Sequence, residues 1–221
     1  MGAGNHSLSA AVAELGPLLT LPDETSAFKG KTGEYVSNDL WSIRYSIIDL
    51  VGVGELIDDL MWDRLELEVP HQEQDNWCWA ATSDGVAHFY DDDTGWTQCE
   101  IANSNLARTD CCGSAGAGVC NVYGFLDRAL NAVGHLDHMA SEAADFQTVD
   151  SEIDARRPLG VRVAWAGGGA HFVAIGGYRE LPEPYVHVED PWYGPSDVPY
   201  STLRSGYQAS GTWTHTYWTR P

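Results

Sequence analysis

The sequence predicts an α+β fold in which helices come first and strands follow. From about residue 77 to residue 156 apolar residues recur at helical spacing, whereas after residue 160 apolar and polar residues alternate. Runs of helices followed by runs of strands are typical of α+β domains, in which each kind of element packs in its own layer. We therefore expect an N-terminal helical part packed on a C-terminal antiparallel β-sheet.

Four helices are predicted ahead of the sheet. Thr97 and Glu100 have the capping-box spacing, in which two side chains satisfy free N–H groups at the start of a helix. Gly134 follows the most regular apolar stripe and is well placed to end it, because glycine readily adopts a left-handed conformation at a helix C-terminus. The expected helices cover 77–90, 97–106, 122–133 and 148–156, and the first has Cys78 at its N-terminus.

Strands are predicted on both sides of these helices. Leucine and valine alternate with glutamate over 65–69 and then meet Pro70, which is typical of a strand that ends at a turn. Four further alternating segments follow the last helix. We expect them to pair antiparallel over 160–165, 171–178, 185–190 and 212–218.

The chain is strongly acidic. Acidic residues outnumber basic ones by 32 to 12, which gives a formal net charge of -20. A surface of this sign repels phosphate backbones and anionic lipid headgroups, so we expect neither nucleic acid nor membranes as partners. Apolar runs are shorter than the roughly 18 residues that a membrane helix needs. The composition predicts a soluble globular protein.

The chain has 5 cysteines, and all but one lie between Cys99 and Cys120. Cys99, Cys111, Cys112 and Cys120 lack the Cys-x-x-Cys spacing of structural zinc sites, so we predict two disulfides and no metal. Disulfides between adjacent cysteines are rare, so we expect Cys99 to pair with either Cys111 or Cys112. The remaining one of those two would then pair with Cys120, and the sequence leaves both pairings open. Clustered disulfides indicate export to an oxidising compartment, although no Sec signal peptide is visible.

Cys78 is the cysteine left over, and it lies in the segment Asn-Trp-Cys-Trp-Ala-Ala at 76–81. A thiol is nucleophilic as its thiolate, which a helix N-terminus and an imidazolium stabilise. His171 can supply the imidazolium, because it opens a predicted strand after glycines at 167–169 that let a substrate backbone approach. A buried, unreactive thiol is the alternative interpretation.

Two further residues complete a candidate site for acyl transfer. Asp190 ends the next predicted strand, where its carboxylate could orient His171 so that one ring nitrogen faces Cys78. Gln72 lies six residues before Cys78, and its amide could join the backbone N–H of Cys78 in stabilising an oxyanion. Gln74 is the competing candidate for that amide, and a turn before proline is the competing role for Asp190.

Together these segments resemble the papain-like cysteine protease superfamily, in particular a bacterial branch of secreted effector proteases with the nucleophile motif Asn-Trp-Cys-Trp-Ala-Ala. The resemblance implies a papain-like fold, with Cys78 as nucleophile and His171 as general base and then acid. It further implies that Asp190 orients the histidine, that Gln72 donates to the oxyanion and that Trp79 shields the site. It implies no cofactor. The similar blocks are 76–81, 97–100, 110–112, 168–172 and 190–192.

The resemblance covers roughly 69–218 and leaves the start of the chain outside. We therefore expect a protease domain over 65–221 and an N-terminal extension over 1–64, which is a propeptide, a regulatory segment or part of the fold. Within the extension, apolar spacing predicts a short helix over 7–19 and a helix over 39–64 that is broken near two glycines.

The leading hypothesis is a cysteine endopeptidase that cuts a protein or peptide substrate through a Cys-His-Asp triad with a Gln-assisted oxyanion hole. The same residues would serve an amidase, deamidase or transglutaminase-like acyl transferase, because the triad sets the chemistry whereas the pockets set the substrate. A catalytically inactive binding module is the remaining alternative, and it predicts that His171 lies out of reach of Cys78. The sequence does not indicate an oligomeric state.

Overall fold

The computed structural model of the chain describes residues 61–180 and 183–221. The helix expected over 7–19 lies outside the described residues, as does most of the broken helix expected over 39–64. The end of that second prediction is wrong, because Asp63–Arg64 form strand β1, which pairs antiparallel with β4. The division of the chain at residue 64 stays a prediction.

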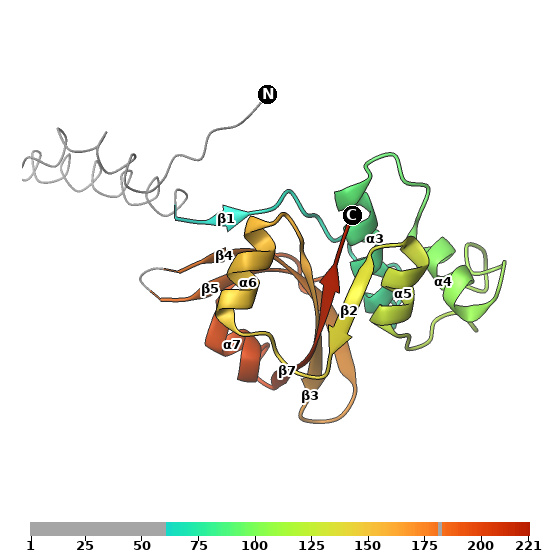
Figure 1. The fold of residues 1–221 in the computed structure, drawn as a ribbon. Helices are drawn as coiled ribbons and strands as arrows, with labels where there is room; N and C mark the ends of the chain where they lie inside the picture. The colour runs from blue at the N-terminus through green and yellow to red at the C-terminus, as the bar shows by residue number, and fades with distance from the viewer. Residues whose placement is uncertain (1–60, 181–182) are drawn as a thin grey trace, which may run out of the picture. The chain divides into compact units, whose positions relative to one another are not determined.

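The described helices form two groups. The first group contains α3 (Cys78–Tyr90), α4 (Gln98–Leu106) and α5 (Leu126–Val133), and Figure 1 shows these three gathered beside the sheet. The second group contains α6 (Phe146–Asp154) and α7 (Tyr200–Ser205), which pack against the sheet itself. The predicted order of helices before strands holds for α3 to α6 and for the strands from residue 159 onward, but two short strands come earlier in the chain and α7, which was not predicted, lies among the later strands.

The sheet is antiparallel throughout its described pairs, as predicted, and its strands follow the order β2-β7-β3-β4-β5-β6. The four strands predicted at the C-terminal end are present with small changes of boundary. They are β3 (Leu159–Trp165), β4 (Ala170–Arg179), β5 (Tyr185–Glu189) and β7 (Gly211–Thr219). Two short edge strands were not predicted, β2 (Leu136–Ala140) and β6 (Ser196–Pro199).

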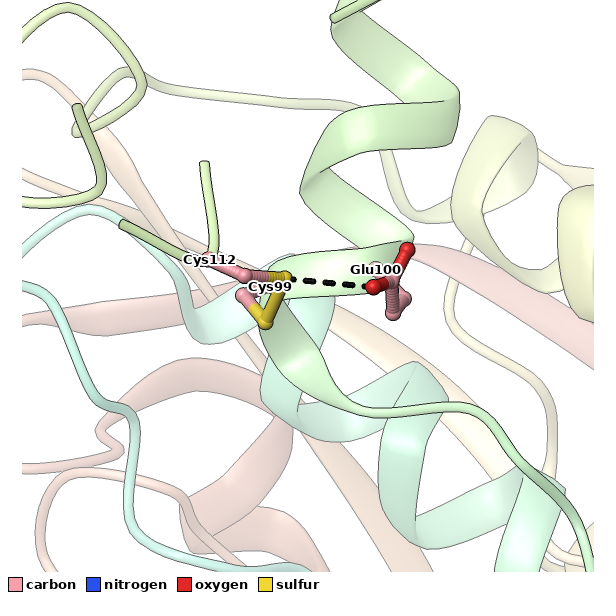
Figure 2. A group of neighbouring side chains, drawn as sticks. All are labelled: Cys99, Glu100 and Cys112. Atoms are coloured by element: carbon pink, nitrogen blue, oxygen red, sulfur yellow. Dashed lines mark hydrogen bonds between the residues drawn. A yellow bond between two sulfur atoms is a disulfide. The ribbon is translucent and has the colours of Figure 1, made fainter. Parts of the chain in front are cut away.

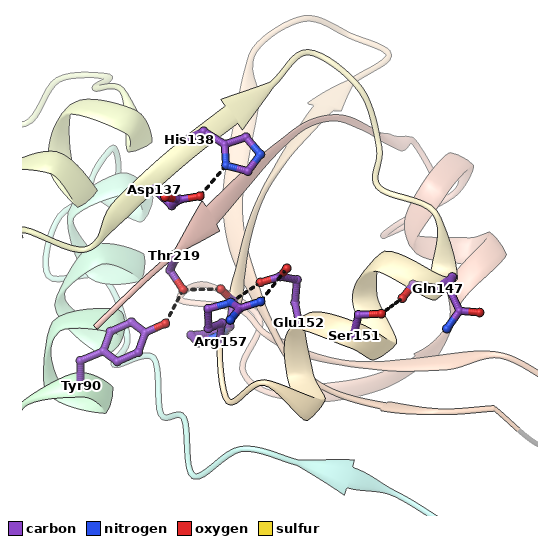
Figure 3. A network of polar contacts seen from close by, with 9 residues as sticks. Tyr90, Asp137, His138, Gln147, Ser151, Glu152, Arg157 and Thr219 are labelled. Carbon is purple, nitrogen blue, oxygen red and sulfur yellow. Dashed lines mark hydrogen bonds and ion pairs between the residues drawn. The ribbon is translucent and has the colours of Figure 1, made fainter.

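Two apolar cores lie on either side of the junction between helices and sheet. One is formed by the sheet with α6 and α7, and the other by α3, α4 and α5. Phe172 of β4 and Tyr217 of β7 belong to the helical core, so these two strands carry the helical group. A polar contact fixes the far end of α3 to the sheet, since the hydroxyl groups of Tyr90 and Thr219 lie 2.8 Å apart (Figure 3).

The local signals for α4 and α6 act through side-chain caps. Thr97 Oγ1 accepts a hydrogen bond from the N–H of Glu100, which confirms the predicted start of α4. Asp145 caps α6 in the same way by accepting from the N–H of Thr148 at 2.8 Å. This carboxylate cap explains why α6 begins two residues before the predicted start at residue 148.

The strand predicted over 65–69 is wrong. Leu65 and Leu67 are buried, and the glutamate that follows each of them is exposed, yet the segment makes no strand ladder. The N–H of Leu65 bonds to the carbonyl oxygen of Gly176 beyond the end of β1, and the chain then runs as an extended strap. The alternation of apolar and acidic residues therefore reflects burial of one face of the segment, which does not pair as a strand.

The helix predicted from residue 122 begins only at Leu126, although it ends as expected at Gly134 with a φ of 92°. The residues before it are not helical, and the carbonyl oxygen of Val122 accepts from the indole N–H of Trp79. Gly124 lies against the same indole, where a Cβ atom would overlap the ring. No helix within the described residues is long and apolar enough to span a membrane.

Candidate active site

Cys78 is the first residue of α3, and its buried side chain is the free thiol among the described cysteines. The first N–H groups of a helix have no acceptor inside the helix and carry the positive end of its dipole. One turn further on, Thr82 Oγ1 donates to the carbonyl oxygen of Phe172 at 3.3 Å. This bond holds α3 against the start of β4, where His171 lies.

The residues on both sides of Cys78 are bonded to one short segment, 120–122. The indole N–H of Trp77 donates to the carbonyl oxygen of Cys120 at 2.7 Å, and that of Trp79 donates to the carbonyl oxygen of Val122 at 3.2 Å. Asn76 donates through its backbone and side-chain N–H groups to Asn121. The polar atoms of the Asn-Trp-Cys-Trp motif therefore fix the position of the thiol between them.

Two disulfides hold the loop that leads to this segment. They pair Cys111 with Cys120 and Cys99 with Cys112, which is one of the two pairings left open by the sequence. The first is buried, whereas the second lies nearer the surface beside the carboxylate of Glu100 (Figure 2). Each disulfide lies close to a carboxylate, Glu100 in one case and Asp110 in the other, in a spacing that could hold a metal ion. A sulfur atom in a disulfide, however, offers no thiolate to a metal.

His171 bonds to Asp190 through one ring nitrogen and faces Cys78 with the other. Its Nε2 lies 2.7 Å from Asp190 Oδ1, so Nδ1 is the nitrogen left for the thiol. Burial alone would lower the pKa of His171, but its hydrogen bonds with Asp190 and with Cys78 outweigh that effect and raise the pKa to about 9. The imidazolium form is therefore favoured beside Cys78 at neutral pH.

The carboxylate of Asp190 is held by four donors. Besides His171, the N–H groups of Trp192 and Tyr193 donate to Oδ1 at 2.8 and 3.0 Å, and the hydroxyl of Tyr207 donates to Oδ2 at 2.7 Å. Burial tends to raise the pKa of Asp190, yet these bonds and the charge of His171 lower it overall. Asp190 is thus an ionised, fixed partner for the imidazole.

Gln72 lies at the rim of the same site, and its N–H donates to the carbonyl oxygen of Pro191 at 2.9 Å. Its Nε2 donates to the carbonyl oxygens of Gln74 and Asp75, both at 2.8 Å, while its Oε1 is buried without a described partner. The side chain of Gln72 is 5% exposed. Gln74 is not among the residues that line the pocket around Cys78 and His171.

Two pockets meet at Cys78. One has a volume of about 240 Å³ and is lined by His171 and Gln72 together with exposed Trp192 and Tyr193. The other has a volume of about 780 Å³ and extends along α5, β3 and β7. The thiol therefore lies where the two pockets adjoin.

The sequence from residue 62 to residue 205 matches the family described as papain-like cysteine protease AvrRpt2. The chain belongs to this family. It is accordingly a papain-like cysteine peptidase, a hydrolase with a mixed helix and antiparallel sheet architecture. No curated protein matches the sequence.

Two solved structures are similar to the protease at low identity. A double glycine motif protease from an AMS/PCAT transporter, in complex with the leader peptide, shares 16% identity and a TM-score of 0.42 over 72% of this chain and 94% of that one. The Pseudomonas avirulence protein AvrPphB shares 10% identity and a TM-score of 0.35 over 71% of this chain and 98% of that one.

Three tryptophans border the two pockets at Cys78, namely Trp79, Trp165 and Trp192. Trp79 is fully buried and borders only the larger pocket, so the shielding expected of it stays a prediction. Trp165 lies nearly parallel to the ring of His171, with centroids 6.1 Å apart and planes at 18°, and it lines the smaller pocket with Trp192. Trp165 therefore lies over one face of the imidazole.

Sequence reasoning missed Trp165 and Tyr207 as parts of the site. Trp165 is the last residue of β3 and pairs opposite Gly211, so only the register of the sheet brings it over His171. Tyr207 lies in the turn between α7 and β7, a segment without a recognisable motif. Neither residue carries a local sequence signal of its contact with the site.

Proposed function

We propose that this papain-like peptidase is an endopeptidase in which Cys78 is the nucleophile, His171 the general base and acid, and Asp190 the orienting carboxylate. The observation that carries the proposal is the double contact of one imidazole, with Asp190 at Nε2 and with Cys78 on its other side. An inactive binding module is disfavoured, because it required His171 to lie out of reach of Cys78.

The reaction begins with transfer of the thiol proton of Cys78 to Nδ1 of His171. The thiolate attacks the carbonyl carbon of the peptide and forms a tetrahedral oxyanion, and the imidazolium then gives its proton to the nitrogen of the leaving amine. A water molecule, deprotonated by His171, attacks the thioester and releases the acid and the thiol. Asp190 keeps its negative charge throughout and stabilises each imidazolium state.

The proposed oxyanion hole combines the backbone N–H of Cys78 with the amide of Gln72. The Nε2 atom already donates to two carbonyl oxygens, so one of these bonds must be exchanged for a bond to the oxyanion. Reversing the amide would instead bring Oε1 against the same two oxygens and repel them. The exchange is favourable only when the negative charge has developed, which is the differential binding that accelerates a reaction.

The position of the acid assigns a direction to the substrate. The leaving amine must lie beside His171 to receive its proton, so the chain after the cut bond occupies the smaller pocket. The acyl part stays on Cys78 and occupies the larger pocket, which does not include His171. Exposed apolar side chains line both pockets, and they favour a protein or peptide substrate in extended form.

The disulfides support export to an oxidising compartment, since such bridges persist outside the reducing cytosol. Intact mass of protein recovered from the culture medium and from the cells would test this. We expect protein with both disulfides formed in the medium. Protein that is confined to the cells with these four cysteines reduced would contradict export.

The function is tested by incubating wild type and Cys78→Ala with a protein library and reading the products by mass spectrometry. New termini in the wild-type digest alone are expected. A mass change of side-chain amides without new termini would instead identify a deamidase or acyl transferase on the same triad. Cutting by Cys78→Ala would overturn the nucleophile, and self-cleavage within residues 1–64 of wild type would identify a propeptide.

A further inference from the structure

The two oxygens of the Asp190 carboxylate have different partners. Oδ1 accepts from His171 and from the N–H groups of Trp192 and Tyr193, whereas Oδ2 accepts from Tyr207 at 2.7 Å. No other hydrogen bond to Oδ2 is found among the described residues. The hydroxyl of Tyr207 is therefore what satisfies the second oxygen of a carboxylate whose side chain is fully buried.

Tyr207 is itself suited to donate permanently. Its side chain is 1% exposed, and burial together with the negative charge of Asp190 raises its pKa far above neutral. The other groups that face its hydroxyl are the uncharged side chains of Gln208 and Ser196. A tyrosine that cannot ionise at working pH keeps its proton directed at the carboxylate.

The backbone around Tyr207 is closed into a tight turn. Its N–H donates to the carbonyl oxygen of Gly211 at 3.1 Å, and the N–H of Gly211 donates back at 2.7 Å. A Cβ atom at Gly211 would overlap the side chain of Val163 in β3, so the turn is pressed directly onto the sheet. The tyrosine is thus carried by a fixed part of the fold.

We propose that Tyr207 is a positioning residue of the catalytic site, which holds Asp190 ionised and oriented towards Nε2 of His171. The inference rests on the proposed triad and adds to it a residue with no contact to substrate, because Tyr207 lines neither pocket at Cys78. Removing its hydroxyl leaves a buried carboxylate oxygen without a donor, which favours protonation of Asp190. Protonated Asp190 no longer stabilises the imidazolium beside Cys78.

The test is the rate of Cys78 alkylation by iodoacetamide as a function of pH, in wild type and in Tyr207→Phe. The acid limb of the profile should move to higher pH in Tyr207→Phe, since Asp190 then takes up its proton earlier. With a peptide substrate, kcat should fall roughly ten- to a hundredfold and KM should stay close to wild type, as expected for loss of a hydrogen bond to a buried charge.

Tyr200→Phe is the matched control. Tyr200 begins α7, and its hydroxyl bonds to the carbonyl oxygen of Ala144 at 2.6 Å, away from Asp190. Its alkylation profile should superimpose on that of wild type. A profile for Tyr207→Phe that also superimposes on wild type would overturn the proposal, whatever the loss of stability in that variant.

Asp190→Asn separates a role through the carboxylate from a general effect on folding. In that background the further change Tyr207→Phe should leave the alkylation profile unmoved, because no carboxylate remains to be held. If Tyr207→Phe shifts the alkylation profile equally in wild type and in Asp190→Asn, Tyr207 does not act through the carboxylate of Asp190. Alkylation needs no peptide, so this experiment decides the role of Tyr207 even if the protein proves to be a deamidase and not an endopeptidase.

Discussion

The indole N–H of Trp77 donates to the carbonyl oxygen of Cys120 at 2.7 Å, so the residue before the thiol is bonded to a residue inside a disulfide. Trp79, on the other side of the thiol, bonds two residues further along the same loop. The position of Cys78 therefore depends on a covalent bridge more than thirty residues away in the chain.

Replacing the buried bridge should reduce activity as well as stability. Cys111→Ala with Cys120→Ala removes a loop closure, which costs about 2 to 3 kcal/mol in free energy of unfolding. It also frees the segment that holds Trp77, so kcat should fall at temperatures where the variant remains folded. Urea unfolding and peptide cleavage measure the two effects.

The other bridge provides the comparison for that experiment. Cys99→Ala with Cys112→Ala removes the closure of a loop of similar length, but neither cysteine belongs to the segment 120–122 to which the motif is bonded. We expect a similar loss of stability with a smaller loss of kcat. Equal losses of kcat in the two double variants would show that the buried bridge has no special link to the thiol.

Gly124 should tolerate no side chain, because a Cβ atom there would overlap the indole of Trp79. Gly124→Ala is expected to lower the free energy of unfolding by about 1 to 3 kcal/mol, as overpacking does, and to lower cleavage by displacing Trp79 beside the thiol. Gly95→Ala, where no atom lies within 4 Å of the added methyl group, serves as the control. A wild-type melting temperature in Gly124→Ala would contradict the close contact.

The pH dependence follows from the two shifted groups of the triad. The pKa of His171 is raised from 6.5 to about 9, so its contribution to stability is complete below about 6.5 and is lost as pH rises through about 9. The pKa of Asp190 is lowered, so its contribution is present above 3.8 and is lost as pH falls through the lower, folded value.

Cleavage should therefore have a broad optimum and decline above pH of about 9, where the imidazolium loses its proton. Initial rates measured from acid to alkaline pH, with stability monitored at each point, check this. If the cleavage rate has already declined fully near pH 6.5, the ordinary pKa of histidine, then the contacts with Asp190 and Cys78 do not raise the pKa of His171.

Gln72→Ala should slow peptide cleavage by roughly a hundredfold or more in kcat, the usual effect of removing an oxyanion donor. Alkylation of Cys78 by iodoacetamide forms no oxyanion and should keep its wild-type rate. Gln74→Ala is the matched variant of the competing glutamine and should change neither rate by much. If alkylation slows as much as cleavage in Gln72→Ala, the amide acts by ordering the turn through its bonds to Gln74 and Asp75.

Local signals predicted the elements that are set by their own residues. The capping pair Thr97 and Glu100 marked the start of α4, and Gly134 marked the end of α5, because both act within a few residues of chain. The strand over 65–69 and the early start of α5 were mispredicted, because apolar patterns report burial whichever neighbour supplies it. The carbonyl oxygen of Val122 bonds to the indole of Trp79, a contact from a distant element that the local apolar pattern does not reveal.

The sequence by itself determined the helix that begins at Cys78, the antiparallel C-terminal sheet and the order of residues that identifies the family, since these depend on local spacing. The tertiary structure decided which cysteines pair, which nitrogen of His171 faces the thiol and that Tyr207 bonds to Asp190. These contacts join segments from different elements, and their geometry follows from strand register and packing, for which no short stretch of sequence carries a signal.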